Sequence, residues 1–318
     1  MPKNDSSDKL TDLINVCYSH FIYEETQSEI AEKMGVSRAK VCKMIAQAKS
    51  MGLYSITIND PIKRVETLSR QLQDKYKLRG IRIVPIPKFG IKNVLERLGI
   101  TTAELVSTLL RDNDVIGIAG GSTLYEMINH LEDINVSNSF IVPLLGGYAE
   151  TEAATHGTEI VYRMAEKLGS AIINMPVPGL AQSAEEAQIF LSNPIIHRSM
   201  NWMQKCSIAL FGIGTPDTKG SFYKAGVLTD KLVEELKEEN AAGCVCFNFY
   251  DAEGAPCERF NSRIIGVSLD DIKQMPITIG VAGGVPEKVP AIRGALLGNY
   301  INFLVTDQVT AEALLELE

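Results

Sequence analysis

The first 60 residues carry apolar side chains at spacings that predict three helices and then a strand. A helix over 9–23 is predicted by five apolar residues three or four positions apart: Leu10, Leu13, Ile14, Cys17 and Phe21. Shorter helices are predicted at 27–34 and 38–50, separated by Gly35, which can adopt the left-handed conformation that ends a helix. In "LYSITI", apolar and polar residues alternate as in a half-buried strand. This order predicts a winged helix-turn-helix domain over residues 1–59.

Residues 60–80 form a predicted linker. Pro61 suits the first turn of a helix, and an apolar stripe follows it at helical spacing: Ile62, Val65, Leu68, Leu72 and Tyr76. Little globular chain surrounds this stripe, so we expect an oligomerisation helix that pairs with its copy in another subunit. Docking on the chain's own large domain is the alternative.

From residue 81 onward, short apolar runs alternate with helical segments. The predicted strands are "IRIVPI", "DVIGIAGG", "SFIVPLLGG", "AIINMPV", "SIALFGIGT", "CVCFNFYD", "ITIGVAGG" and "INFLVTD". Many are β-branched runs without polar alternation, as expected of strands covered on both faces. Residues 81–318 are therefore predicted to form a doubly wound α/β domain with right-handed crossovers.

Composition and charge narrow the class of protein. With 318 residues, 45% of them hydrophobic and 22% charged, the chain should be globular. No apolar run reaches the roughly 18–20 residues that span a bilayer, and the polar start has no signal-peptide core, so we expect a cytoplasmic protein without a membrane partner. The six cysteines fit no zinc spacing, which predicts reduced, mostly buried thiols, no metal and no cofactor.

The charge is unevenly distributed. Residues 1–75 hold 11 basic and 10 acidic side chains, whereas the remainder holds 20 and 29, which is net −9. Between Lys33 and Lys49 there are five basic residues and no acidic one. On a helix beginning at Arg38, the basic side chains point away from the apolar face. They occupy the exposed N-terminal half of the helix, which in a helix-turn-helix enters the major groove. The predicted DNA contacts are Gln27, Ser37, Arg38, Lys40 and Lys43. A solvated helix face is the alternative.

Glycine-rich loops follow four of the predicted strands and lead into helices. Gly120, Gly121, Ser122 and Thr123 open one helix, where backbone N–H groups and two hydroxyls would make an anion site. Similar loops contain Gly146-Gly147, Gly214-Thr215 and Gly283-Gly284, the last shortly before Lys288. Such loops converge where doubly wound folds bind ligands. None fits GxGxxG or GxxxxGK[ST], which argues against dinucleotides and nucleoside triphosphates.

Polar residues near these loops are candidates for contacts with sugar hydroxyl groups. They are Thr155, His156, Asp217 and Asp251. A histidine with a purely structural role is the alternative for His156, and a turn aspartate is the alternative for Asp251.

The whole chain from residue 10 to 318 resembles the SorC family of bacterial sugar-responsive transcription regulators. The motifs that carry the resemblance are "TQSEIAEKMGVSRAKVCKMIAQAKSMGLYSITI", "DVIGIAGGSTLYEMI", "VPLLGG", "FNFYDAEG" and "VAGGVPEKVPAIRGALLGNYINFLVTDQVTAEALL". The resemblance implies a tetrameric repressor or activator whose C-terminal domain is similar to sugar-phosphate isomerases and deaminases and binds a phosphorylated sugar.

The resemblance also implies roles for single residues. Gly120 to Thr123 would hold phosphate, and Lys288 would approach the ligand. The pocket would further be lined by Gly146, Gly147, Thr155 and Asp251. The residue before the Gly146-Gly147 pair is basic in some members, but here it is Leu145, which excludes a Schiff base and favours a monophosphate over a bisphosphate.

The predicted function is a DNA-binding regulator of a carbohydrate operon, controlled by a noncovalently bound sugar or sugar-alcohol phosphate. The partners would be double-stranded operator DNA, this effector, and further copies in a dimer or tetramer. An isomerase- or deaminase-like enzyme is a competing interpretation, although no carboxylate–histidine pair indicates catalysis, so no catalytic residue is assigned. Two more interpretations stay open: an architectural DNA-binding protein, and a regulator that senses an unphosphorylated sugar.

Overall fold

The computed structural model describes residues 5–54, 61–85, 94–147, 152–224 and 226–317. The chain folds as two compact units, Met1–Asp60 and Pro61–Glu318. The division lies next to the expected end of the first domain at residue 59. Among the described residues, no helix is both long and apolar enough to cross a membrane.

The first unit contains three helices whose ends follow from local sequence. They are α1 (Asp5–Phe21), α2 (Gln27–Met34) and α3 (Arg38–Ser50), so the predictions at 27–34 and 38–50 are confirmed. Thr26 and Glu29 form a capping box at the start of α2, and Gly35 ends α2 at φ 63°. The Ser37 hydroxyl accepts a hydrogen bond from the Lys40 N–H and caps α3. The predicted strand "LYSITI" covers residues 53–58, of which 55–58 lie outside the described residues.

The core of this unit uses only part of the predicted apolar stripe of α1. Val16 packs with Ile30, Ala31 and Val41. In contrast, Leu10, Ile14 and Phe21 are 39%, 36% and 38% exposed. Of the five residues whose spacing predicted this helix, Leu13 is buried and these three are exposed. Helical spacing alone does not show which apolar residues of α1 meet α2 and α3.

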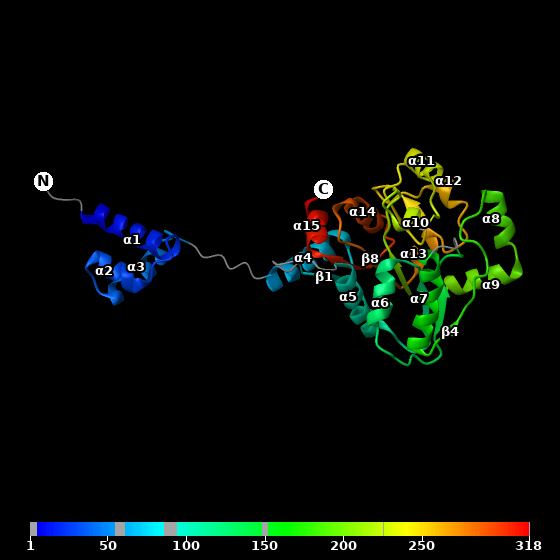
Figure 1. Cartoon of the computed structure of the whole chain (residues 1–318), viewed down its shortest axis with the longest axis horizontal. Coiled ribbons are helices and arrows are strands. Elements are labelled where there is room, and N and C mark those ends of the chain that lie inside the picture. Colours follow the sequence, from blue (N-terminus) through cyan, green and yellow to red (C-terminus); the bar gives the residue numbers. More distant parts are fainter. Residues whose placement is uncertain (1–4, 55–60, 86–93, 148–151, 225, 318) are drawn as a thin grey trace. The chain divides into compact units, whose positions relative to one another are not determined.

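The second unit is built on a parallel sheet with strand order β1-β9-β8-β5-β2-β3-β4 (Figure 1). Its strands are β1 (Gly80–Val84), β2 (Val115–Ile118), β3 (Phe140–Pro143), β4 (Ala171–Ile172), β5 (Ile208–Gly212), β8 (Ile277–Val281) and β9 (Phe303–Asp307). All neighbouring strands in it pair in parallel. The α/β class predicted from the unalternated apolar runs is confirmed.

One predicted strand is not part of this sheet. The run "CVCFNFYD" forms the antiparallel hairpin β6 (Gly243–Val245) and β7 (Asn248–Tyr250). Cys246 and Phe247 make its turn at φ 48° and 64°, and both side chains are buried. An Asn-Gly pair usually signals such a turn, so the sequence lacked the ordinary hairpin signal and the single-strand prediction was wrong.

Helices cover both faces of the sheet. The helices of this unit are α4 (Pro61–Tyr76), α5 (Val94–Leu109), α6 (Ser122–His130), α7 (Glu152–Leu168), α8 (Ala184–Leu191), α9 (Pro194–Met203), α10 (Ser221–Lys224), α11 (Asp230–Glu238), α12 (Glu258–Asn261), α13 (Leu269–Gln274), the 3₁₀ helix η1 (Pro286–Lys288), α14 (Val289–Leu297) and α15 (Gln308–Glu316). Helices α5, α6 and α7 share one hydrophobic cluster with the sheet, whereas α4, α9, α14 and α15 share another. This arrangement is the doubly wound architecture.

Helix α4 packs on its own unit. Leu68 and Leu72 are 7% and 0% exposed. The Tyr76 hydroxyl and the Lys75 ammonium donate to the carbonyl oxygen of Leu314 in α15 at 3.0 and 3.3 Å. The expectation that little of the chain surrounds this apolar stripe is therefore wrong. A role of α4 in oligomerisation stays a prediction, but an uncovered stripe no longer supports it.

The order of the strands changes direction between two neighbouring strands. From β2 the chain continues outward through β3 and β4, whereas from β5 it continues in the other direction through β8 and β9. The two directions diverge between the neighbours β2 and β5. In doubly wound sheets, ligands bind in the crevice at the carboxyl ends of the strands that meet at such a switch point.

Candidate functional site

A cavity of about 760 Å³ opens at this switch point. It is lined by the loops that follow β2, β5 and β8 and by Leu145 after β3. The cavity brings together five of the predicted ligand residues: Gly120, Gly121, Ser122, Thr123 and Lys288. It also contains Gly214, Thr215 and Asp217, which the sequence pattern had indicated near the glycine loops.

The start of α6 presents backbone donors to this cavity. Gly121 precedes the helix at φ 139°, a conformation that side chains strongly disfavour. The first N–H groups of a helix have no intrahelical partners, and no side chain caps them at the start of α6. Thr123 is buried, whereas Ser122 is exposed. Unpaired N–H groups together with the helix dipole favour an anion here.

Lys288 places a positive charge in the same cavity. It ends η1 immediately before α14, and its side chain is partly buried. No hydrogen bond or ion pair joins its ammonium to any part of the chain that the structure describes. Burial is the main cause that lowers the pKa of Lys288; Cys244 and the Asp307 carboxylate act in the opposite direction, and the Lys224 ammonium adds a smaller lowering effect. An unpaired, partly buried cation beside a cavity is available to an anionic ligand.

Asp307 is a supporting residue that the sequence motifs did not indicate. Its Oδ2 accepts hydrogen bonds from the Gly284 N–H at 2.6 Å and from the Thr310 hydroxyl at 2.7 Å. A Cβ on Gly283 would lie only 2.2 Å from the same oxygen, so glycine is required there. The carboxylate thus holds the loop that leads to Lys288. An aspartate between a buried strand and a helix start was the signal that could have identified it.

The pair Gly146 and Gly147 does not repeat the anion site of α6. Their N–H groups donate to the carbonyl oxygens of Ile265 and Val177 at 3.0 and 2.8 Å. A Cβ on Gly146 would also lie 2.6 Å from the Val177 oxygen. The expectation that this loop offers free donors is therefore wrong, because close backbone packing uses them. A ligand contact at these glycines stays a prediction.

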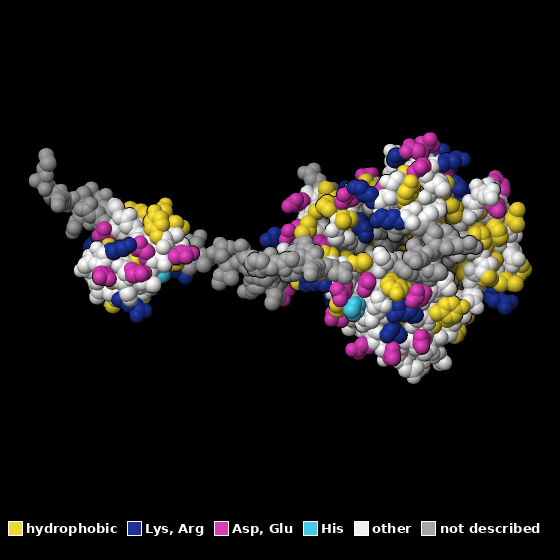
Figure 2. All heavy atoms as spheres, viewed as in Figure 1, with side chains coloured by type: hydrophobic (Ala, Val, Ile, Leu, Met, Phe, Trp, Pro, Cys, Tyr) yellow, Lys and Arg dark blue, Asp and Glu magenta, His cyan; other side chains and the backbone are white. Residues whose placement is uncertain are grey.

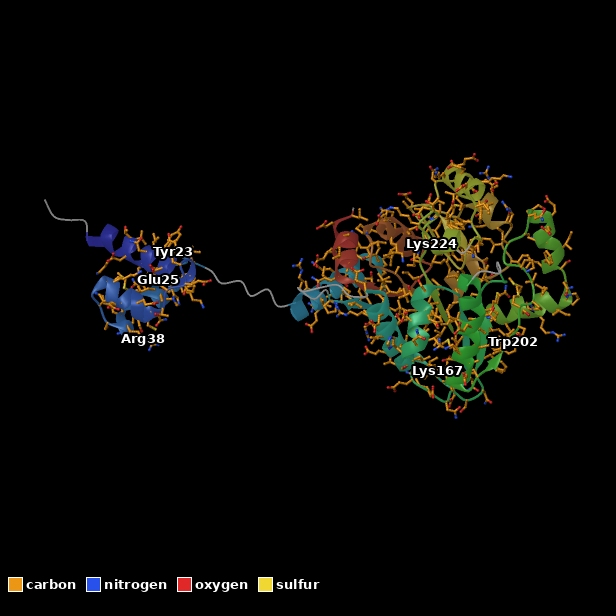
Figure 3. All side chains as sticks on the ribbon, in the orientation of Figure 1. Tyr23, Glu25, Arg38, Lys167, Trp202 and Lys224 are labelled. Carbon is orange, nitrogen blue, oxygen red and sulfur yellow. The ribbon has the colours of Figure 1, made fainter. Side chains whose placement is uncertain are left out.

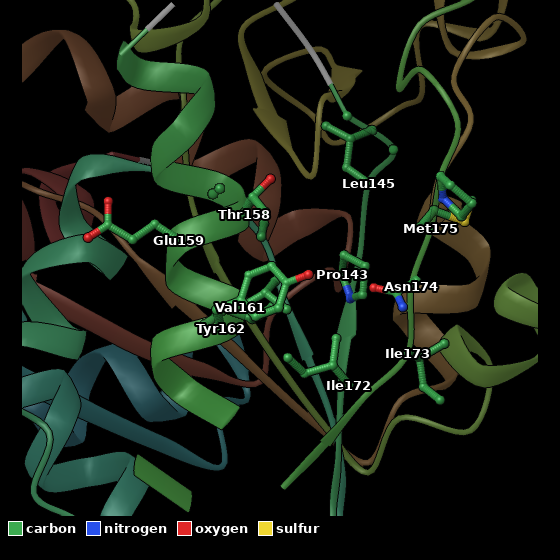
Figure 4. A pocket seen from close by; sticks show the side chains of 17 residues that line it. Pro143, Leu145, Thr158, Glu159, Val161, Tyr162, Ile172, Ile173, Asn174 and Met175 are labelled. Atoms are coloured by element: carbon green, nitrogen blue, oxygen red, sulfur yellow. The ribbon is translucent and has the colours of Figure 1, made fainter. Parts of the chain in front are cut away.

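Both glycines line a second, largely apolar cavity of about 930 Å³ (Figure 4). Pro143, Tyr162 and Met175 surround it, and Leu145 lines both cavities. Leu145 can form neither an imine nor an ion pair, so the wall between the cavities is uncharged at this position.

The remaining predicted ligand residues are placed differently. Asp251 lies in a turn after β7, where its Oδ1 accepts the N–H groups of Glu253 and Ala255 at 3.0 and 2.7 Å. It lines neither of the two cavities. Thr155 and His156 lie in α7, but their side chains are outside the described part of the structure.

The predicted DNA contacts lie at the start of α2 and on and before α3. Arg38, Lys40 and Lys43 are exposed on α3, and no acidic side chain within the described ranges pairs with them. Figure 3 labels Arg38 at the start of this helix. Ser37 caps α3, and Gln27 is the partly exposed first residue of α2. In contrast, Lys33 pairs with Glu25 at 2.6 Å.

The cysteines of the described segments are all unpaired, and four of the six are buried. No group of three or more His, Cys, Asp or Glu side chains in the described segments could hold a metal ion.

Comparisons with known proteins agree with this architecture. The family model of a sugar-binding domain matches residues 60–316. The deoxyribonucleoside regulator of Bacillus subtilis (strain 168) is 32% identical over 293 residues, which cover 91% of this chain and 92% of that protein. The sorbitol operon regulator of Klebsiella pneumoniae is 26% identical and is covered over 100% of its length by 98% of this chain.

Solved structures show the same fold. Full-length SorC from Klebsiella pneumoniae aligns with a TM-score of 0.73 at 24% identity, covering 97% of this chain and 100% of that chain. A transcriptional regulator from Streptococcus pneumoniae TIGR4 aligns with a TM-score of 0.76 at 27% identity, covering 81% and 98%. These relatives are transcription regulators and not enzymes. The chain belongs to the SorC family of sugar-responsive transcription regulators, with a sugar-binding domain over residues 60–316.

Proposed function

We propose that this regulator controls a carbohydrate-catabolism operon and that a small sugar phosphate or sugar-alcohol phosphate sets its affinity for DNA. The observation that carries the proposal is one cavity that combines the uncapped start of α6 with the unpaired ammonium of Lys288. The ligand would bind noncovalently, because Leu145 cannot form an imine. The relatives named for deoxyribonucleosides and sorbitol support a small polyhydroxylated effector.

The DNA partner would be an operator read by α3. The exposed, unpaired Arg38, Lys40 and Lys43 suit guanine edges and phosphates of the major groove. One recognition helix reads few base pairs, so we propose that the protein acts as a dimer or tetramer with its DNA-binding units paired about a two-fold axis. For regulation, the effector must bind one arrangement of the subunits more tightly than the other.

Helix α1 supplies a surface for this pairing. Its exposed side chains Leu10, Ile14, Tyr18 and Phe21 follow one helical stripe, and Figure 2 shows hydrophobic side chains gathered on the α1 side of the unit. In a two-fold pair, this stripe of one copy would pack against the same stripe of the other copy, as an isologous interface requires.

The test of the effector begins with a thermal-shift screen of the full-length protein. The screen compares free and phosphorylated sugars and polyols of four to six carbons, because a ligand specific to the native state raises its stability. Calorimetry then compares the best phosphorylated hit with its free form on the wild type and on Thr123→Val. We expect the phosphate form to bind more tightly and the variant to lose about tenfold in affinity.

The link to DNA is tested with the same ligand. Operator duplexes selected from a random pool should change their affinity for the wild type when the hit is added. Equal binding of the free form, with no loss in Thr123→Val, would favour an unphosphorylated effector. An adduct trapped by borohydride would contradict noncovalent binding.

A further inference from the structure

The proposed effector accounts for the cavity at the switch point (the switch-point cavity) but not for the second, largely apolar cavity beside α7 (the apolar cavity). Their volumes are about 760 and 930 Å³. Pockets of about 300–1,000 Å³ hold drug-sized ligands, so the switch-point cavity alone has room for a phosphorylated sugar of four to six carbons. The apolar cavity therefore offers space for a further part of the effector.

The two cavities share a border. Ala119, Gly120 and Leu145 line both of them. Ala119 and Gly120 follow β2 and carry no bulky side chain, and Leu145 follows β3 and carries no charge. A ligand that binds beside the start of α6 can therefore extend past Gly120 into the apolar cavity without passing a charged side chain at this border.

The walls of the apolar cavity suit a planar ring. Val161 and Met175 are buried and contribute apolar surface, and Tyr162 on α7 is 55% exposed. Aromatic rings pair in offset-stacked or edge-on arrangements, and a thioether sulfur such as that of Met175 also contacts aromatic rings favourably. The wall thus combines an accessible aromatic ring with a polarizable apolar surface.

Two uncharged polar groups face each other across this cavity. In Figure 4, the Tyr162 hydroxyl and the Asn174 amide point toward one another, with Pro143 between them. Neither group has a hydrogen bond with the part of the chain that the structure describes. The carboxylate of Glu159, which also lines the cavity, lies 3.6 Å from the Arg163 guanidinium. A ligand is therefore offered neutral donors and acceptors here.

We infer that the effector is a glycoside, whose sugar binds in the switch-point cavity and whose planar, uncharged ring binds in the apolar cavity. The inference rests on the proposed function, since it adds a second part to the same effector. A phenyl group and a nucleobase share this chemistry. Burial of such a ring removes apolar surface from water, and the facing hydroxyl and amide would orient its polar substituents.

The experiment compares ligands with and without the ring on the full-length protein. One pair of probes is D-glucose 6-phosphate and phenyl β-D-glucoside 6-phosphate, which tests a phenyl group. The other pair is 2-deoxy-D-ribose 5-phosphate and thymidine 5′-monophosphate, which tests a nucleobase. Binding constants are measured by calorimetry for the wild type, Tyr162→Ala, Asn174→Trp and the control Ile189→Ala, which changes an exposed apolar residue on α8.

We expect the wild type to bind at least one ring-bearing probe about tenfold or more tightly than its ring-free partner, because the ring is buried against apolar side chains. Tyr162→Ala should lose about fivefold for that probe and little for the ring-free partner. Asn174→Trp places an indole in the cavity and should remove the advantage of the ring. Ile189→Ala should behave as the wild type.

The inference is overturned if neither ring-bearing probe binds the wild type more tightly than its ring-free partner, or if Tyr162→Ala and Asn174→Trp both leave that advantage unchanged. The proposed function would stand in either case if a ring-free phosphate ester binds and Thr123→Val weakens its binding. If unphosphorylated phenyl β-D-glucoside or thymidine binds as tightly as its phosphate ester, and Tyr162→Ala weakens that binding, the ring site stands and the phosphorylated effector is wrong.

Discussion

At the scale of single residues, the switch-point cavity is lined by one destabilising charge, and a stabilising carboxylate outside it holds one of its loops. Lys288 holds a partly buried ammonium without a partner in the described structure, and burial is the main cause of its lowered pKa. Asp307 is buried but accepts three hydrogen bonds, from the Gly284 N–H, the Thr310 N–H and the Thr310 hydroxyl. The unpaired group is available to a ligand, whereas the satisfied group holds the loop.

Replacing Lys288 by Met should stabilise the ligand-free protein and abolish its stabilisation by the effector. We expect the free energy of unfolding at pH 7 to rise by about 1 kcal/mol, as when a residue kept for binding is replaced by one that packs better. Urea unfolding followed by circular dichroism measures this difference.

The same variant has a predicted pH dependence. The pKa of Lys288 is lower in the folded protein than in the unfolded chain, so deprotonation relieves the cost of burying the charge. As the pH increases through the pKa of Lys288 in the folded protein, the free energy of unfolding of the wild type should therefore rise relative to that of Lys288→Met. The difference between the two proteins should narrow. A gap that widens at alkaline pH would contradict the role of burial.

At the scale of elements, α3 separates its packing face from its charged face. Val41 and Ala48 are fully buried, whereas Arg38, Lys40 and Lys43 are exposed. Because the charged side chains contribute little to the core, their removal should leave the fold intact and act on DNA binding.

The triple variant Arg38→Ala, Lys40→Ala, Lys43→Ala should lose at least a hundredfold in operator affinity. The slope of the logarithm of its DNA-binding constant against the logarithm of the salt concentration should also become shallower, by about 0.9 for each phosphate contact that is lost. Fluorescence anisotropy at several salt concentrations measures both effects. Lys33→Ala is the matched control, since Lys33 already pairs with Glu25. Unchanged operator affinity in the triple variant would remove α3 as the recognition helix.

At the scale of the whole molecule, the proposed regulation requires that copies of the chain act together. The DNA-binding unit exposes Ile14 at 36% and Tyr18 at 54% along α1, and neither belongs to the unit's buried core. These side chains can therefore be changed without unfolding the unit, which separates subunit pairing from stability.

Replacing Ile14 by Glu should weaken binding to an operator with two half-sites by about tenfold or more, because the paired carboxylates would be desolvated next to each other. Binding to a single half-site and the melting temperature should be nearly unchanged. Asn15→Glu adds the same charge one position away on α1 and serves as the control. If Ile14→Glu binds the two-half-site operator as tightly as the wild type, pairing through α1 is wrong.

The amino-acid sequence alone determined the features that depend on neighbours along the chain. The ends of α2 and α3 follow from Thr26, Gly35 and Ser37, because caps and left-handed glycines act within one helical turn. The parallel sheet follows from unalternated apolar runs, and the loop before α6 follows from its glycines. These signals are local, so no tertiary contact was needed to identify them.

Only the tertiary structure decided which surfaces meet. It buried the α4 stripe against α15, folded "CVCFNFYD" into a hairpin outside the sheet, and engaged the Gly146 and Gly147 donors with backbone far along the chain. It also brought Lys224 into the cavity of Lys288, although 64 positions separate the two residues along the chain. Helical spacing and turn chemistry specify an element and its apolar faces, but the partner of each face depends on the packing of the whole fold.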